Sequence, residues 1–186
     1  FNKYSMTSYT TQNSLLLNNL IKFYEEDDNL EVMLNIINGE SPISLRIVDW
    51  FVTNYAKQKF TVYNLDEGRR FKVYNDYKLK LKAYSKKRFD PFCRWDRITI
   101  PYKNDTMIQT TIGQLNFFKW ALENEIIAYI KDNYADIEKD MNNRNSTSKR
   151  RLTLTNSKTR KKREELSISA SKTIKQENVS VTIKFD

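Results

Sequence analysis

The feature that most constrains the fold is one long helical pattern between residues 113 and 141. Apolar side chains recur there every three or four residues, as they do on the buried face of an α-helix. They are Leu115, Phe118, Leu122, Ile126, Tyr129, Ile130, Tyr134, Ile137 and Met141. Thr111 and Gln114 have the spacing of a capping box, which predicts that the helix begins directly after Thr111. We therefore expect one long helix whose first half forms the centre of the core.

Shorter patterns before this helix complete the expected fold. Helical spacing of apolar residues predicts helices at residues 14–24, 29–37, 41–58 and 74–87, the third starting at Ser41 and Pro42. Alternation of apolar and polar residues predicts short strands near residues 60–64, 70–73, 98–102 and 107–110. The expected fold class is therefore α+β, a mainly helical single domain with one small antiparallel sheet, over residues 14–141.

Both ends of the chain differ in composition from this domain. Residues 1–13 are polar and without a period, which predicts a flexible lead-in. Residues 142–186 form a basic, low-complexity segment with too little apolar surface to offset the entropy of ordering, so we expect a disordered tail. Within this tail, residues 179–185 alternate as an edge strand would, added either to the core or to a partner.

A dense block of basic and aromatic residues extends from Arg69 to Arg97 and is called the basic-aromatic block below. It holds eleven Lys and Arg residues against three Asp residues, and seven aromatic side chains lie between these charges. Such a surface can contact phosphates and stack on bases. The same pattern is also typical of a helix that buries its aromatic side chains and leaves its lysines in solvent.

Within the block, Lys78, Lys82 and Lys86 are spaced four residues apart, so a regular helix aligns them in one row. Like charges at this spacing repel, and either solvent or a polyanion compensates them. The tail adds two compact basic clusters. The candidate nucleic-acid-binding residues are Arg69, Arg70, Lys78, Lys82, Lys86, Lys87, Arg88, Arg94, Lys149, Arg150, Arg151, Arg160, Lys161, Lys162 and Arg163. The expected partner is DNA or RNA, contacted at its phosphates without sequence preference.

The composition argues against an enzyme and against a metal or cofactor site. The chain has no histidine, one cysteine (Cys93) and three glycines, so it lacks the commonest general base, Cys/His zinc ligands and a Gly-rich phosphate loop. No cofactor is expected, and no apolar run reaches the length of a membrane span. We expect Cys93 to be buried. Asp90 and Asp96 are the alternative for a catalytic site, although salt bridges to Arg88, Arg94 and Arg97 explain them more simply.

Three phrases of the sequence carry a resemblance to a known family. They are SLRIVDWFVTNY at residues 44–55, FDPFCR at residues 89–94 and TTIGQLNFFKWA at residues 110–121. They resemble an uncharacterised protein family of nucleocytoplasmic large DNA viruses, of the mimivirus-like and phycodnavirus-like kind. This resemblance spans about residues 43–141 and implies a viral setting with replication in the host cytoplasm, without implying an activity.

Two functions follow as expectations. The first is a non-enzymatic, nucleic-acid-associated viral protein that serves genome packaging, chromatin or transcription through the basic-aromatic block and the basic tail. The alternative is a virion structural or scaffold protein that binds other viral proteins through the same aromatic residues. The expected location is the viral factory in the host cytoplasm or the virion, with the nucleus as a further alternative.

Overall fold

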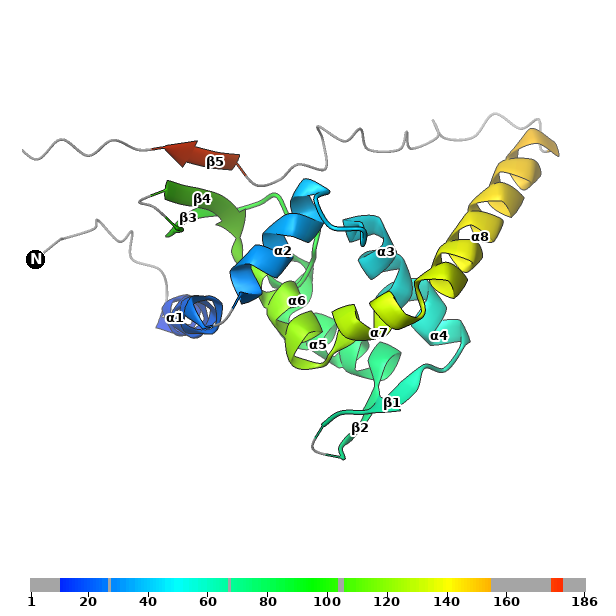
Figure 1. The fold of residues 1–186 in the computed structure, drawn as a ribbon, viewed down its shortest axis with the longest axis horizontal. Coiled ribbons are helices and arrows are strands. Elements are labelled where there is room, and N and C mark those ends of the chain that lie inside the picture. Colours follow the sequence, from blue (N-terminus) through cyan, green and yellow to red (C-terminus); the bar gives the residue numbers. More distant parts are fainter. Residues whose placement is uncertain (1–10, 27, 67, 104–105, 155–174, 179–186) are drawn as a thin grey trace, which may run out of the picture.

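A computed structural model gives the fold of residues 11–26, 28–66, 68–103, 106–154 and 175–178, with side chains described between residues 14 and 145 (Figure 1). This part of the chain is mainly helical and carries short antiparallel strands. The expected class, an α+β single domain dominated by helices, is therefore confirmed. In the described residues, no helix is both long and apolar enough to cross a bilayer.

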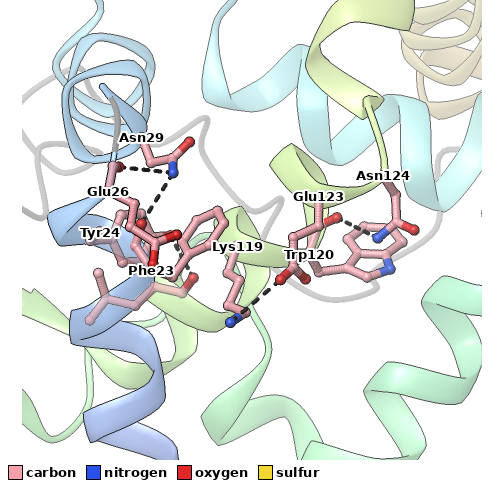
Figure 2. A network of polar contacts seen from close by, with 9 residues as sticks. Phe23, Tyr24, Glu26, Asn29, Lys119, Trp120, Glu123 and Asn124 are labelled. Atoms are coloured by element: carbon pink, nitrogen blue, oxygen red, sulfur yellow. Dashed lines mark hydrogen bonds and ion pairs between the residues drawn. The ribbon is translucent and has the colours of Figure 1, made fainter. Parts of the chain in front are cut away.

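The chain begins with two helices joined at a tight corner, α1 (Thr11–Glu25) and α2 (Asn29–Asn38). Figure 2 shows how Asn29 holds the corner, because its side-chain amide donates to the backbone oxygens of Phe23 and Glu26, both at 3.1 Å. These bonds satisfy carbonyls that the end of α1 leaves without a helical partner. Helix α2 ends at Gly39, whose φ of 79° lies in the left-handed region, as the sequence predicts.

The next helical segment consists of α3 (Leu45–Trp50), the π-helical stretch η1 (Phe51–Tyr55) and α4 (Ala56–Gln58). The predicted start at Ser41 and Pro42 is wrong. Helix α3 begins at Leu45 because the side chain of Ser44, and not that of Ser41, caps it by accepting from the Ile47 N–H at 3.3 Å. Ser41 instead closes a turn by accepting from the N–H of Ile43.

The strands form two separate sheets, so the predicted single sheet is wrong. Strands β1 (Val62–Asn64) and β2 (Arg70–Lys72) pair as one hairpin, while β3 (Arg97–Pro101), β4 (Thr106–Thr111) and β5 (Lys175–Asn178) pair in that order. Strand β4 leads directly into helix α6 (Ile112–Glu123). Tyr63 of the hairpin donates to the backbone oxygen of Asn124, just beyond the other end of that helix. The length of α6 keeps the two sheets apart. The strand predicted at residues 179–185 lies outside the described residues.

Helix α5 (Val73–Arg88) carries most of the basic-aromatic block and matches the helix predicted at residues 74–87. Tyr77, Leu81 and Tyr84 pack half-buried against the core, as their spacing predicts. The helix is interrupted at Ser85, whose φ of 63° and ψ of 164° lie far from helical values. This combination is almost restricted to glycine, so Ser85 is a strained point in the backbone.

The predicted long helix is divided into α6 (Ile112–Glu123), α7 (Ile126–Asp132) and α8 (Tyr134–Leu154), so the prediction of one continuous helix is wrong. At each break an asparagine side chain donates to the carbonyl four residues earlier, Asn124 to Trp120 and Asn133 to Tyr129. Glu125 then adopts a left-handed φ of 55° that turns the chain. Helix α8 continues past residue 142, where the sequence placed the start of the tail, and projects from the body of the fold (Figure 1).

The core is centred on α6, as its apolar face predicts. The buried side chains of this helix include Leu115, Phe117, Phe118, Trp120 and Ala121, and the helix contacts α1, α2, α5, α7 and β4. The predicted cap is confirmed, since the Thr111 hydroxyl accepts from the N–H of Gln114 at 3.2 Å. Helix α6 is thereby placed to anchor the basic helix α5 on one side and the α1–α2 pair on the other.

Candidate nucleic-acid interface

The aromatic side chains of the basic-aromatic block mostly face the core. Phe71 and Phe89 are buried, and the rings of Tyr77, Tyr84, Phe117 and Trp120 all lie within 6.2 Å of the Phe89 ring centre. Trp95 is the exception, with 72% of its surface exposed. Most of these rings therefore serve packing, and the basic side chains between them are directed outward.

Lys78 and Lys82 are exposed on α5 and line one open cavity of about 680 Å³, together with Tyr74, Asn75, Leu79 and Leu81. Neither lysine forms an ion pair with any acidic residue in the described part of the chain. Their spacing of four residues keeps the two ammonium groups close enough to repel. This pair is the part of the predicted lysine row that the structure brings together.

Lys86 does not continue that row, although its spacing predicts that it would. The irregular backbone at Ser85 separates Lys86 from the regular part of α5, and its Nζ lies 4.0 Å from Oδ2 of Asp90. Burial and the charge of Asp90 raise the pKa of Asp49, and the positive charge of Lys86 lowers it by a smaller amount. Lys86 therefore pairs with Asp90, and its alignment with Lys78 and Lys82 is a wrong prediction.

The basic residues after the kink are exposed on an anchored backbone. The carbonyl of Lys87 accepts from the Cys93 thiol at 3.3 Å, and that of Arg88 accepts from the Asn116 amide at 2.9 Å. Cys93 is buried, as predicted. Arg94 is exposed in the loop that follows. Lys87, Arg88 and Arg94 thus form a second exposed basic group at the far end of α5.

Arg69 and Arg70 lie on the β1–β2 hairpin and differ in their surroundings. The Arg69 guanidinium donates to Oδ1 of Asn124 at 3.1 Å, which fixes the hairpin to the end of α6. Arg70 is exposed on β2. Arg69 therefore has a structural contact that competes with any phosphate contact.

The tail candidates are placed only in part. Lys149, Arg150 and Arg151 lie on the last turns of α8, and their side chains lie outside the described part of the chain. Arg160, Lys161, Lys162 and Arg163 lie outside the described residues.

A second cavity, which the sequence patterns missed, adjoins the first. It has a volume of about 490 Å³ and shares Tyr74 and Asn75 with the cavity of Lys78 and Lys82. Its other lining residues include Lys57, Phe60, Thr61 and Lys72. Phe60 was expected in a strand because residues 59–64 alternate, but β1 begins only at Val62. The exposed aromatic side chain of this cavity, Phe60, therefore lies outside the basic-aromatic block.

The aspartates proposed as a catalytic alternative have structural surroundings. The Asp90 carboxylate accepts from the N–H of Phe92 at 2.9 Å and faces Lys86, while Asp96 is exposed. Burial, reinforced by the charge of Asp90, raises the pKa of Asp49 to about 6. Burial and the same two carboxylates raise the pKa of Tyr77 to about 12. Among the described residues, no three Cys, Asp or Glu side chains gather closely enough to hold a metal ion.

Comparisons with known proteins agree with the resemblance found in the sequence. A model of DUF7197, described as a family of unknown function, matches residues 1–184. "Uncharacterized protein L507" of Acanthamoeba polyphaga mimivirus is 44% identical over 142 residues, which is 72% of this chain and 55% of the relative. The chain thus spans about half the length of this relative, and neither match assigns an enzymatic activity. No solved structure matches. The chain belongs to DUF7197, a family of unknown function with a relative in a giant virus.

Proposed function

We propose that this protein is a non-enzymatic, nucleic-acid-associated giant-virus protein that binds phosphate backbones through the exposed face of α5. Genome packaging, chromatin organisation and accessory roles in transcription all require such binding. The proposed place of action is the viral factory in the host cytoplasm or the virion. The basic clusters of the tail add affinity that does not depend on nucleic-acid sequence.

The observation that carries this proposal is the pair Lys78 and Lys82. Both side chains are exposed, adjoin one open cavity and have no carboxylate partner in the described part of the chain. Two close ammonium groups without an acid raise the local positive potential, and phosphates are the counter-ions that a viral genome offers at high density. Lys86, by contrast, has the carboxylate of Asp90 4.0 Å from its Nζ.

A virion scaffold protein is the second candidate, and exposed apolar side chains favour it. Leu15, Leu79 and Trp95 are each at least 63% exposed. Where such residues form a contiguous patch, the patch is typical of a site at which another protein binds. Binding to other viral proteins without any affinity for nucleic acid would favour this candidate over the first.

The test is a salt titration of binding to labelled duplex DNA with the full chain and its Lys78→Ala/Lys82→Ala variant. Loss of two phosphate contacts makes the slope of log K against log salt less steep by about 1.8. Lys22→Ala/Lys131→Ala is the matched control, because it removes the same charge from exposed positions on α1 and α7. We expect the control to keep the wild-type slope.

A variant with Arg160, Lys161, Lys162 and Arg163 changed to Gln separates the tail from the folded domain. If this variant loses all binding while Lys78→Ala/Lys82→Ala binds as the wild type does, the interface proposed on α5 is refuted. If the wild-type protein is not retained on DNA or RNA at about 50 mM salt, the nucleic-acid proposal as a whole is refuted.

A further inference from the structure

The two adjoining cavities form one groove along the first half of α5. They share Tyr74 and Asn75, so the two cavities lie side by side and together are called the groove. Phe60 lies in the smaller cavity and Leu79 in the larger one, and both are among the most exposed large apolar residues, at 84% and 65%. The groove therefore offers flat and apolar surface to a ligand.

Phe60 occupies a backbone position that favours glycine. Helix α4 ends in a Schellman motif, in which the N–H of Thr61 donates to the carbonyl of Ala56 at 3.1 Å. Phe60 occupies the left-handed position of this motif, with a φ of 49°. A bulky side chain is rare at such a φ. Because the ring is also almost fully exposed, it contributes little to the core. A strained residue that does not stabilise the fold points to a function.

Thr61, next to Phe60, supplies an independent sign of a ligand. Its side chain is 93% buried and lines the smaller cavity, yet its Oγ1 has no hydrogen-bond partner among the described residues. A buried hydroxyl without a partner costs free energy, and native structures usually satisfy it. Because less than 1 Å² of this oxygen is accessible, a polar group of a ligand in the cavity supplies the missing bond only if the side chains around Thr61 shift.

Charge decides the class of ligand. Lys57 and Lys72 line the smaller cavity and Lys78 and Lys82 the larger one, and the residues that line the two cavities include no acid. Lys57 lies over the Tyr74 ring, with its Nζ 5.6 Å from the ring centre. Flat apolar side chains between several lysines suit a ligand that combines flat rings with phosphates. Bases inside a duplex are already stacked, so only unpaired bases can lie on Phe60.

We infer that this groove binds single-stranded nucleic acid, with Phe60 as the stacking platform for an unpaired base and the four lysines as phosphate contacts. This inference rests on the proposed function and adds to it a preference for single strands. It also assigns roles to Lys57, Phe60 and Lys72.

The experiment measures fluorescence anisotropy of a labelled single-stranded 20-mer and of the matching duplex with the full chain. Phe60→Ala is expected to weaken binding of the single strand by about 5- to 150-fold, the range for one stacked base, and to change duplex binding less than twofold. Phe60→Tyr should keep the wild-type affinity. Leu15→Ala is the control, since it removes an exposed large apolar side chain on α1, outside the groove and the basic-aromatic block, and should leave both affinities unchanged.

Phe60→Gly guards against unfolding as the cause of a loss. Glycine relieves the left-handed backbone, so this variant should melt at a higher temperature than the wild type while it loses affinity for the single strand. Unchanged single-strand affinity in Phe60→Ala, with Lys78→Ala/Lys82→Ala still defective, would refute the inference and leave the proposed function intact. No binding of either nucleic acid by the wild type would refute both.

Discussion

Gly113→Ala tests the contact that holds the basic end of α5 in place. Gly113 lies in the first turn of α6, and a Cβ added there would lie 2.8 Å from Cβ of Cys93, 2.9 Å from the carbonyl oxygen of Lys87 and 3.0 Å from Sγ of Cys93. Carbon and oxygen atoms do not approach so closely without a shift. The variant therefore overpacks the contact between α6 and residues 87–93.

The neighbouring segment cannot easily move away, because hydrogen bonds hold it to α6. The N–H of Asp90 donates to the carbonyl of Gly113 at 3.3 Å, and the amides of Gln114 and Asn116 donate to the carbonyls of Pro91 and Arg88. Overpacking of a core costs about 1–3 kcal/mol. Alanine regains up to about 1 kcal/mol of helix propensity. We expect a net loss of about 1–2 kcal/mol in the free energy of unfolding.

Urea unfolding and thermal melting of the full chain measure this loss, which corresponds to a melting temperature lower by about 2–8 °C. Cys93→Gly removes two of the three close contacts, so Gly113→Ala should cost less in that background. Gly39→Ala is the control: it has open space but a φ of 79°, and its cost should not depend on Cys93. A Gly113→Ala variant as stable as the wild type would refute the packing of α6 on residues 87–93.

Two further predictions concern polar groups in the interior. Burial and the charge of Asp90 raise the pKa of Asp49 to about 6, so the folded protein binds a proton at this carboxylate more tightly than the unfolded chain does. The free energy of unfolding therefore falls as the pH rises from about 4 to about 6. Asp49→Asn should be more stable than the wild type at pH 7, by on the order of 1–3 kcal/mol, and as stable as the wild type at pH 3. Urea unfolding that gives the same difference in stability at both pH values would contradict this prediction. Tyr24→Phe deletes the hydrogen bond that the Tyr24 hydroxyl donates to the carbonyl of Leu115, at 2.6 Å. It should lower the free energy of unfolding by about 1–2 kcal/mol, measured by thermal melting, without changing nucleic-acid affinity. An unchanged melting temperature would argue against this buried bond.

Local patterns predicted those parts of the fold in which neighbours in the sequence decide the structure. The cap formed by Thr111 and Gln114, the antiparallel pairing of β3 with β4 and the left-handed Gly39 all depend on nearby residues. The break after α6 depends instead on Asn124, which combines a local bond to Trp120 with contacts to Tyr63 and Arg69 of the distant β1–β2 hairpin. No Gly or Pro marks that break, so periodicity alone predicts one continuous helix.

The sequence predicts only those parts of the candidate site whose positions depend on regular local structure. Lys78 and Lys82 follow from regular helical spacing, and the structure does bring them together. Lys86 was assigned to their row because nothing in the sequence marks the irregular backbone at Ser85. The alternation at residues 59–64 predicts a strand that includes Phe60. In the structure, Lys59 and Phe60 instead form the C-terminal end of α4, and β1 begins at Val62.

The contacts of Asn124 restrict which amino acids evolution can place at that position. Its amide nitrogen donates to Trp120, its side-chain oxygen accepts from Arg69, and its backbone oxygen accepts from Tyr63 (Figure 2 shows the bond to Trp120). Aspartate lacks the donor, and glutamine is one methylene too long to reach the carbonyl four residues earlier in the same geometry. A change of Asn124 to an apolar residue therefore removes both the bond to the Trp120 carbonyl and the bond from Arg69 in a single step, so we expect the effects of substitutions at positions 69 and 124 to be coupled.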